Sequence, residues 1–351
     1  MEFGLQFFPD VGPDVKPPDL YWAECLHLAS LADELGYTHI RTVEHYFQSY
    51  GGYSPNPHLF LAAAAMRSKK ARLVTGAVLP IFNNPLKIAG EIGMLDAISG
   101  GRLECGFARA FLPIEFEVFG RSLDESKARF AEGMEQVREL LEKENVTSEG
   151  KFHSFRNATS TPRPTQKPRP PFWIAALITP DSFSNAGTMG YNIMAIPLTG
   201  GAMRDLIGRY RAAWAAAKHP GKGKVMLAHH MFCHEDDKKA LEISRAPLNR
   251  YLKSVVRAAS LWQGGVKSND YAGYDKVVEM LDKETTETQM EKSAAFIGSP
   301  AKLIDQIARY QEETGGFEIA SLQVNFNDLP ADVAAHSMRL FGEKVIPHIK
   351  K

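Results

Sequence analysis

The chain has 351 residues, of which 44% are hydrophobic and 23% are charged, and its 41 acidic and 41 basic residues give a formal net charge of zero. This composition is typical of a folded globular protein. Without a charge excess there is no reason to expect a nucleic acid or an anionic membrane as a partner. Cys25, Cys105 and Cys233 form no CxxC pair, which favours a reducing cytoplasm. The sequence shows no signal peptide and no apolar run long enough to span a bilayer, so we expect neither secretion nor membrane insertion.

Eight apolar runs bounded by turn residues predict eight strands, with helical patterns between them. They cover residues 2–8, 38–43, 72–79, 102–107, 172–176, 192–197, 224–232 and 318–326. Strands that alternate with helices are parallel, and eight of them close a barrel. An open doubly wound sheet is the rival, but no Gly-x-Gly-x-x-Gly follows the first strand. We therefore predict an α/β fold in which residues 1–351 form a single (β/α)8 TIM-barrel domain.

Two insertions interrupt this alternation. After strand four, residues 145–171 are polar and rich in proline, which predicts an extended surface excursion. After strand seven, residues 240–296 contain helical patterns and a charged stretch of low hydrophobicity. Insertions after barrel strands lie on the catalytic face and, when long, often form lids. The second insertion is therefore either a lid or a helical hairpin without a role in catalysis.

Glu44 and His45 follow the second predicted strand directly, at the end of the barrel where this fold carries its chemistry. A histidine there can exchange a proton or bind a polar cofactor, although a structural loop histidine is the alternative. An aromatic loop with two glycines comes next, containing Tyr46, Phe47, Tyr50 and Tyr53. These rings, with Phe111 after strand four, predict an apolar substrate pocket or simply packing on the barrel top.

Other candidates follow strands four, five and seven. Arg109 is a plausible phosphate ligand, with a surface salt bridge as the alternative. Thr179 and Pro180 look like the N-cap and first residue of a helix, whose N-terminus can bind an anion, although Asp181 in the first turn counts against a phosphate. His229, His230, Cys233 and His234 alternate between two strand faces. They therefore do not converge on one ion, and we predict no metal site.

The motifs, taken together, resemble those of the bacterial luciferase-like flavin-dependent monooxygenases. The most specific block is 95–106, Leu-Asp-Ala-Ile-Ser-Gly-Gly-Arg-Leu-Glu-Cys-Gly. Matching pieces stand in order around it over nearly the whole chain: 3–4, 35–37, 43–47, 56–57, 79–80, 84–85, 118–120 and 298–300. Residues 145–171 and 240–296 carry little resemblance.

The resemblance implies a barrel that binds FMN at the carboxyl ends of its strands. Reduced FMN would come from a separate reductase, and its reaction with O2 would give a C4a-peroxyflavin that oxygenates a substrate. His45 matches the active-site histidine, and we place Glu44 beside it as a second catalytic residue. Gly76-Ala77 falls where the family often has a non-prolyl cis peptide under the flavin. The other expected flavin contacts are Val78, Ala108, Arg109, Lys127 or Arg129, Ala176, Thr179 and Ser182.

Some positions depart from the family pattern. Ala108 replaces the reactive cysteine of luciferase, which argues against light emission, and Ile178 replaces an acidic residue beside the phosphate. We expect Val78, Leu79 and Phe107 to form an apolar wall for the flavin. The expected activity is FMN-dependent monooxygenation of a small or medium, partly apolar organic molecule, with a homodimer implied by resemblance. The alternatives are an F420-dependent hydride-transfer oxidoreductase on the same barrel and a catalytically silent flavin-binding protein.

Overall fold

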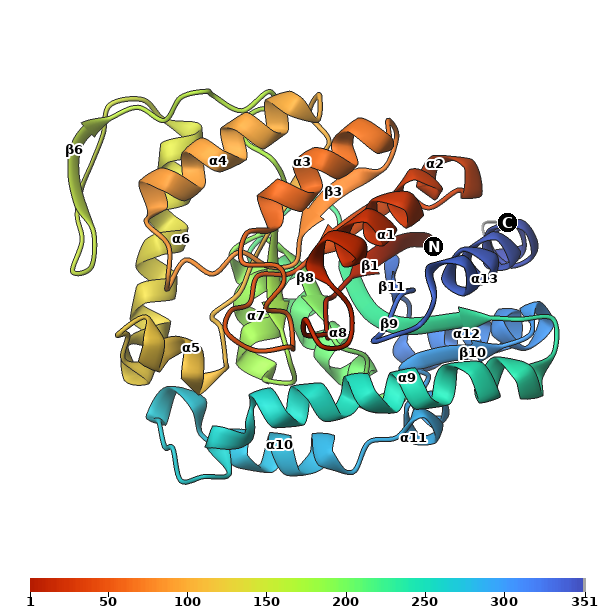
Figure 1. The fold of residues 1–351 in the computed structure, drawn as a ribbon. Helices are drawn as coiled ribbons and strands as arrows, with labels where there is room; N and C mark the ends of the chain where they lie inside the picture. The colour runs from red at the N-terminus through yellow and green to blue at the C-terminus, as the bar shows by residue number, and fades with distance from the viewer. Residues whose placement is uncertain (350–351) are drawn as a thin grey trace.

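A computed structural model describes residues 1–349 and shows a closed parallel barrel of eight strands with helices around it (Figure 1). The barrel strands are β1 (Glu2–Phe7), β2 (His39–Thr42), β3 (Arg72–Thr75), β4 (Leu103–Phe107), β7 (Phe172–Ala176), β8 (Asn192–Ala195), β9 (Val225–Cys233) and β11 (Ile319–Gln323). They pair in this order, and β11 closes the ring by pairing in parallel with both β9 and β1. The predicted (β/α)8 fold is therefore confirmed.

Helices that cover the outside of the barrel begin where the sequence carries helix-start signals. They are α1 (Pro18–Ser30), α2 (Ala32–Leu35), α3 (Pro57–Arg67), α4 (Pro85–Ile98), α6 (Ser126–Glu142), α7 (Pro180–Thr188), α8 (Gly200–Ala216), α12 (Pro300–Thr314), α13 (Ala331–Lys344) and α14 (Ile346–Ile349). Five of them open with proline, whose fixed φ suits the first helical position. Asn56 and Asn84 cap α3 and α4, and each side chain accepts a backbone N–H bond of 2.9 Å.

The chain between β4 and β7 contains α5 (Pro113–Val118), η1 (Leu123–Glu125) and α6, followed by the first insertion, residues 145–171, which holds a hairpin of β5 (Val146–Glu149) and β6 (Ser154–Ala158). The antiparallel hairpin stands away from the barrel (Figure 1). The hairpin is consistent with an excursion at the surface, although its two short strands were not predicted from the sequence. The excursion is tied to the barrel through Gln166, whose amide donates to the buried Asp96 carboxylate at 2.8 Å.

The second insertion, after β9, contains α9 (Asp237–Ala258), η2 (Ser260–Trp262), η3 (Asn269–Tyr271), α10 (Tyr274–Asp282), α11 (Thr286–Glu291) and β10 (Ala295–Gly298). The strand β10 was not predicted. It pairs in parallel with β9 outside the closed ring, so Gly298 lies opposite Cys233. The helices α9 and α10 run side by side along one side of the barrel, and η2, which lies between them in the chain, contacts α5 (Figure 1). Within residues 1–349, no helix has both the length and the apolar character that a membrane span requires.

Candidate active site

The barrel interior is filled at one end and reached by solvent at the other. Val74, Trp173, Met194, Met226 and Ile319 form an inner apolar cluster, and the Trp173 indole donates to Glu104 at 2.7 Å. Further along the strands, three inward positions are partly exposed although both sequence neighbours are buried: Ala175, Ala228 and His230. Because strand side chains alternate between the two faces, this exposure shows that solvent enters the barrel at the carboxyl ends of its strands.

His45 lies at this open end and is buried in an aromatic surround. Its ring is 5.7 Å from that of Phe8, 5.5 Å from that of Tyr50 and 5.9 Å from that of Phe111. The loop folds back on itself, with the His45 N–H donating to the Ser54 carbonyl at 3.2 Å. Gly51 has a φ of 81°, and a Cβ there would lie 2.5 Å from the Cβ of His45. A glycine is therefore required to let the loop close over the imidazole.

Glu115 on α5 fixes the orientation of that imidazole. Its Oε1 lies 3.0 Å from the His45 Nδ1 and accepts the Tyr46 backbone N–H at 2.9 Å. The carboxylate is fully buried, and its Oε2 has no partner among the described residues. An acceptor on Nδ1 holds the proton there and leaves Nε2 as the nitrogen available to a ligand. Glu115 was not predicted from the sequence, because it stands 70 residues from His45 in a short helix.

The carboxylate of Glu44 points to the loop after β3. It accepts hydrogen bonds from Tyr46 Oη at 2.6 Å, Asn83 Nδ2 at 2.7 Å and the Leu79 N–H at 3.1 Å. Burial raises the pKa of Glu44 to about 8, against the lowering effect of these three bonds. Its contacts tie the loops after β2 and β3 together. The catalytic role expected for Glu44 stays a prediction, and these contacts indicate positioning instead.

The peptide between Gly76 and Ala77, directly after β3, is cis, as the resemblance predicted.

The side chains of Phe107 and Ala176 face away from the barrel interior, where they were expected to contact the flavin. A Cβ on Gly106 would lie 2.6 Å from Met194 inside the barrel, so Gly106 faces inward and Phe107 faces outward. The Phe107 ring packs against Phe172, 4.9 Å away. The expectation that Phe107 walls the flavin is therefore wrong.

Side chains along β7 also alternate between its two faces, and this alternation places Ala175, not Ala176, on the face toward the barrel interior. Ala176 belongs to the cluster between the sheet and the helices, whereas Ala175 lies with the inner cluster and is partly exposed. The methyl group that faces the barrel interior is therefore that of Ala175, one residue before the predicted contact. Val78 is buried and bridges to Phe107 after β3 ends, and Ala108 is partly exposed.

The basic residues expected at the phosphate are distributed over two places. The Arg109 guanidinium lies 4.3 Å from the centre of the Tyr271 ring and donates to the Asp270 carbonyl at 3.0 Å. Lys127 is exposed, and its Nζ lies 3.5 Å from the Asp270 carboxylate. Arg129 instead binds Glu125 at 3.0 Å. Of the two alternatives, Lys127 is therefore the one that shares a neighbour with Arg109.

Thr179 and Ser182 lie at the start of α7, as predicted. Thr179 occupies the N-cap position and is exposed, and its side chain makes no capping hydrogen bond. The hydroxyl is therefore left for a ligand at the end of the helix where an anion is favoured. Asp181 occupies the first turn of the same helix.

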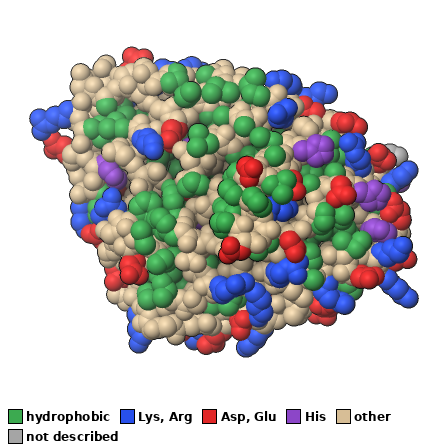
Figure 2. All heavy atoms as spheres, in the orientation of Figure 1, with side chains coloured by type: hydrophobic (Ala, Val, Ile, Leu, Met, Phe, Trp, Pro, Cys, Tyr) green, Lys and Arg blue, Asp and Glu red, His purple; other side chains and the backbone are tan. Residues whose placement is uncertain are grey.

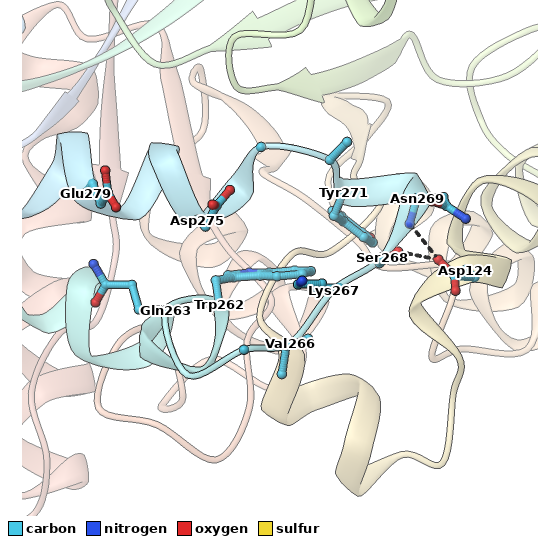
Figure 3. A pocket seen from close by; sticks show the side chains of 13 residues that line it. Asp124, Trp262, Gln263, Val266, Lys267, Ser268, Asn269, Tyr271, Asp275 and Glu279 are labelled. Carbon is cyan, nitrogen blue, oxygen red and sulfur yellow. Dashed lines mark hydrogen bonds between the residues drawn. The ribbon is translucent and has the colours of Figure 1, made fainter.

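The second insertion packs directly on the loop after β4. The Trp262 indole donates to the Phe111 carbonyl at 2.9 Å, and the Tyr271 hydroxyl lies 2.9 Å from the Arg109 carbonyl. The outer side of this segment carries an open hollow of about 770 Å³ (Figure 3). There Ser268 and Asn269 bind Asp124 at 2.6 and 2.9 Å. The residues that line this hollow do not include His45 or Arg109, so it lies apart from the barrel mouth.

The histidines of β9 diverge as their alternation predicted. His229 faces outward, stacks on Phe296 at 4.3 Å and bonds to the Ser293 carbonyl at 2.8 Å. His230 faces inward, with its ring 4.6 Å from that of Tyr251. Among residues 1–349, no group of three or more His, Cys, Asp or Glu side chains is arranged to hold a metal ion.

Comparison with known proteins places this site in a family. The model of the luciferase-like monooxygenases matches residues 1–316. The chain is similar to the monooxygenase RslO1 from Streptomyces bottropensis, with 39% identity, a TM-score of 0.88 and coverage of 99% of this chain and 100% of that one. It is 32% identical to the oxygenase component of the flavin-dependent trigonelline monooxygenase of Acinetobacter baylyi, over 68% of this chain and 67% of that protein.

A relative with a different cofactor is also found. The F420-dependent glucose-6-phosphate dehydrogenase of Intrasporangium calvum is 25% identical over 91% of this chain and 92% of that protein. The family match, which covers nine-tenths of the chain, is independent of the cofactor that any one relative uses. From its barrel, its open mouth and these matches, the chain belongs to the luciferase-like monooxygenase family of oxidoreductases.

Proposed function

We propose that the protein is the oxygenase component of a two-component, FMN-dependent monooxygenase that acts on a small or medium organic substrate. The observation that carries this proposal is the His45–Glu115 pair at the mouth of a barrel that solvent enters. Arg109 follows β4 on the same rim, and Phe111, two residues later, lies 5.9 Å from the His45 ring. Both residues therefore belong to loops at the carboxyl end of the barrel, which supports a site shared by the imidazole and the guanidinium.

The residues at the mouth fit a flavin. Small, partly exposed side chains on consecutive strands offer an apolar surface to a planar ring, at Ala108 and Ala175. Arg109 and the uncommitted hydroxyl of Thr179 follow β4 and β7, which are neighbours in the barrel. A cation and a helix N-terminus on adjacent strands suit a phosphate. Reduced flavin, when bound, supplies the activation of O2, which no protein side chain provides.

The protein's own contribution is positioning, proton transfer and exclusion of water. The Glu115 carboxylate holds the His45 proton on Nδ1 and stabilises the imidazolium when Nε2 accepts a second proton. The rings around His45, of which Phe8 is buried and Tyr50 and Phe111 are partly buried, restrict water near that nitrogen. The segment of η2 and η3, which rests on the loop after β4, acts as a lid whose opening admits ligands.

We propose that a separate reductase delivers reduced FMN to this protein in the cytoplasm; the trigonelline relative, which is named as the oxygenase component of a flavin-dependent monooxygenase, supports such a division of labour. We also propose a homodimer. Exposed apolar side chains lie on neighbouring helices α3 and α4: Leu59, Met66, Leu86, Met94 and Ile98. Figure 2 shows hydrophobic side chains gathered on the edge where these helices lie in Figure 1. An exposed apolar patch on two adjacent helices fits a twofold interface.

Oxygen consumption tests the function. The purified protein is mixed with reduced FMN and O2 across a panel of substrates, and products are identified by mass. We expect incorporation of one oxygen atom, with most turnover lost in His45→Ala while the circular dichroism spectrum is kept. Separate titrations with FMN and F420 measure which cofactor binds. Preferential F420 binding with O2-independent hydride transfer would establish the alternative, and FMN binding without oxygenation of any substrate would indicate a silent flavoprotein.

A further inference from the structure

Arg41, in the middle of β2, is a buried cation inside the barrel without an acidic partner. Its side chain is 8% exposed, and a Cβ on Gly76 would lie 1.9 Å from its Nε. Nη1 donates to the Gln6 amide oxygen and Nη2 to the Gly76 carbonyl at 3.0 Å, whereas Nε has no partner. Among the described residues, no carboxylate forms an ion pair with Arg41. Burying an unpaired charge is costly, so this arginine calls for a ligand.

The side chains around Arg41 offer further polar groups and no compensating negative charge. His230 faces the barrel interior from β9, and both of its ring nitrogens are buried without partners. Burial lowers the pKa of His230 to about 3, so the imidazole is neutral and has one N–H to donate. The pKa of Arg41 is lowered to about 10 by burial, which leaves it charged at neutral pH. The buried carboxyl of Asp10 is bonded to Asn327, at 2.7 and 3.1 Å.

Strand order places this cluster beside the expected flavin contacts: Arg41 donates to the carbonyl of Gly76, which follows β3, while Gln6 and His230 lie further round the ring. Arg41, Gln6 and His230 lie on β2, β1 and β9, and β11 joins β9 to β1. The expected flavin contacts follow β3, β4 and β7, which form the other arc of the ring. A flavin held by β3, β4 and β7 therefore leaves β9, β11, β1 and β2 to face a second ligand. His45, at the end of β2, stands at the boundary between the two arcs.

We propose that Arg41 and His230 form a subsite for an oxyanion of the substrate, a carboxylate, phenolate or enolate oxygen attached to an aromatic or alicyclic body. This inference rests on the proposed oxygenase function and names its substrate class. A guanidinium paired with an oxyanion makes a charge-assisted hydrogen bond, the strong kind in a buried site. The rings of Phe8, Tyr50 and Tyr251, which contact one another at 4.4 to 6.0 Å, provide the apolar wall for the body of that substrate.

A matched pair of probes tests the subsite without turnover. The full-length protein is first saturated with oxidised FMN, and binding of 2-naphthoate and of neutral 2-naphthamide is then measured by titration calorimetry. We expect naphthoate to bind about 10- to 100-fold more tightly in the wild type. Arg41→Met should remove this preference while naphthamide binding is kept, and Arg41→Lys should retain part of it. Arg209→Met, on the exposed face of α8, is the control and should match the wild type.

The anionic reduced flavin is the other source of an oxyanion, and a separate arm tests it. Anaerobic titration with dithionite-reduced FMN should give similar affinities in the wild type and Arg41→Met. If Arg41→Met still prefers naphthoate but no longer binds reduced FMN, then Arg41 binds the flavin and not the substrate. That result would overturn the substrate subsite. Equal binding of the two probes by the wild type would overturn it as well. Failure of FMN to bind at all would count against the oxygenase function, whereas probe selectivity in the FMN-free protein would still report on Arg41.

Discussion

Replacing Glu115 by glutamine tests the proposed role of the His45–Glu115 pair with little change in shape. The amide keeps an oxygen that can accept the Tyr46 N–H and the His45 Nδ1–H, which lie 2.9 and 3.0 Å from the present Oε1. What it removes is the negative charge beside a buried imidazole. Hydrogen bonds to charged groups contribute about 1.5 to 3 kcal/mol, and each 1.36 kcal/mol is a factor of ten in rate. We therefore expect Glu115→Gln to lower the rate of oxygenation about 10- to 150-fold.

The assay separates proton transfer from folding and from cofactor binding. Turnover is measured as oxygen incorporation over a range of pH, and FMN affinity and thermal unfolding are measured in parallel. The pH profile of Glu115→Gln should shift because the imidazolium loses its negatively charged neighbour. FMN affinity should stay within about threefold, since the Glu115 side chain forms its hydrogen bonds with His45 and Tyr46 among the residues that the structure describes. Glu117→Gln, on the exposed side of the same helix α5, is the matched control. If both variants turn over alike, the carboxylate at 115 plays no part in the chemistry.

Three further predictions concern the cofactor, the loop after β2 and the assembly. Arg109→Met should weaken FMN binding about 10- to 100-fold, as measured by flavin fluorescence, because it removes a charged phosphate partner; unchanged binding would exclude that contact. The pKa of Glu44 is raised to about 8 from an ordinary value of 4.5, so protonation favours the fold below pH 4.5 and this contribution is lost as the pH rises to 8. Glu44→Gln should therefore unfold in urea with a flatter pH dependence than the wild type between pH 5 and 8, and parallel curves would refute the shift. Met94→Glu should convert a dimer to a monomer in size-exclusion chromatography, whereas Met189→Glu, exposed on another helix surface, should not; a monomeric wild type would end the dimer proposal.

Local patterns were sufficient to predict the barrel. Each of the eight strands carries its own apolar run, and the helix starts carry proline or a capping residue, as at Pro57 and Asn84. The missed strand β10 is only four residues long, and its apolar run resembles any buried segment. Its pairing with β9 depends on where the chain comes back to the sheet at the end of the second insertion, and no local sequence pattern shows this position.

The site was predicted in part, for a related reason. His45 and Arg109 could be found because they stand directly after strands, where the fold places its ligands. Glu115 could not, since its significance lies in a contact across 70 residues. In the sequence Arg41 is one of several polar residues in the run 38–43, and only barrel closure shows that it faces inward. The outward facing of Phe107 and Ala176 could not be predicted, because the sequence does not show which residues of a strand face inward when both of its faces are buried.

The pairing of β10 with β9 has a consequence for how the protein can change. The chain leaves the barrel after Cys233 and comes back at Gly298, opposite its point of departure. Adjacent strands stand about 4.8 Å apart. The more than sixty residues between Cys233 and Gly298 therefore begin and end at neighbouring points of the sheet, and closure of the barrel does not depend on their number. This second insertion can thus be shortened, lengthened or replaced as a unit, because loop closure entropy varies only slowly with length. New substrate preferences can arise there while the strands that hold the chemistry keep their register.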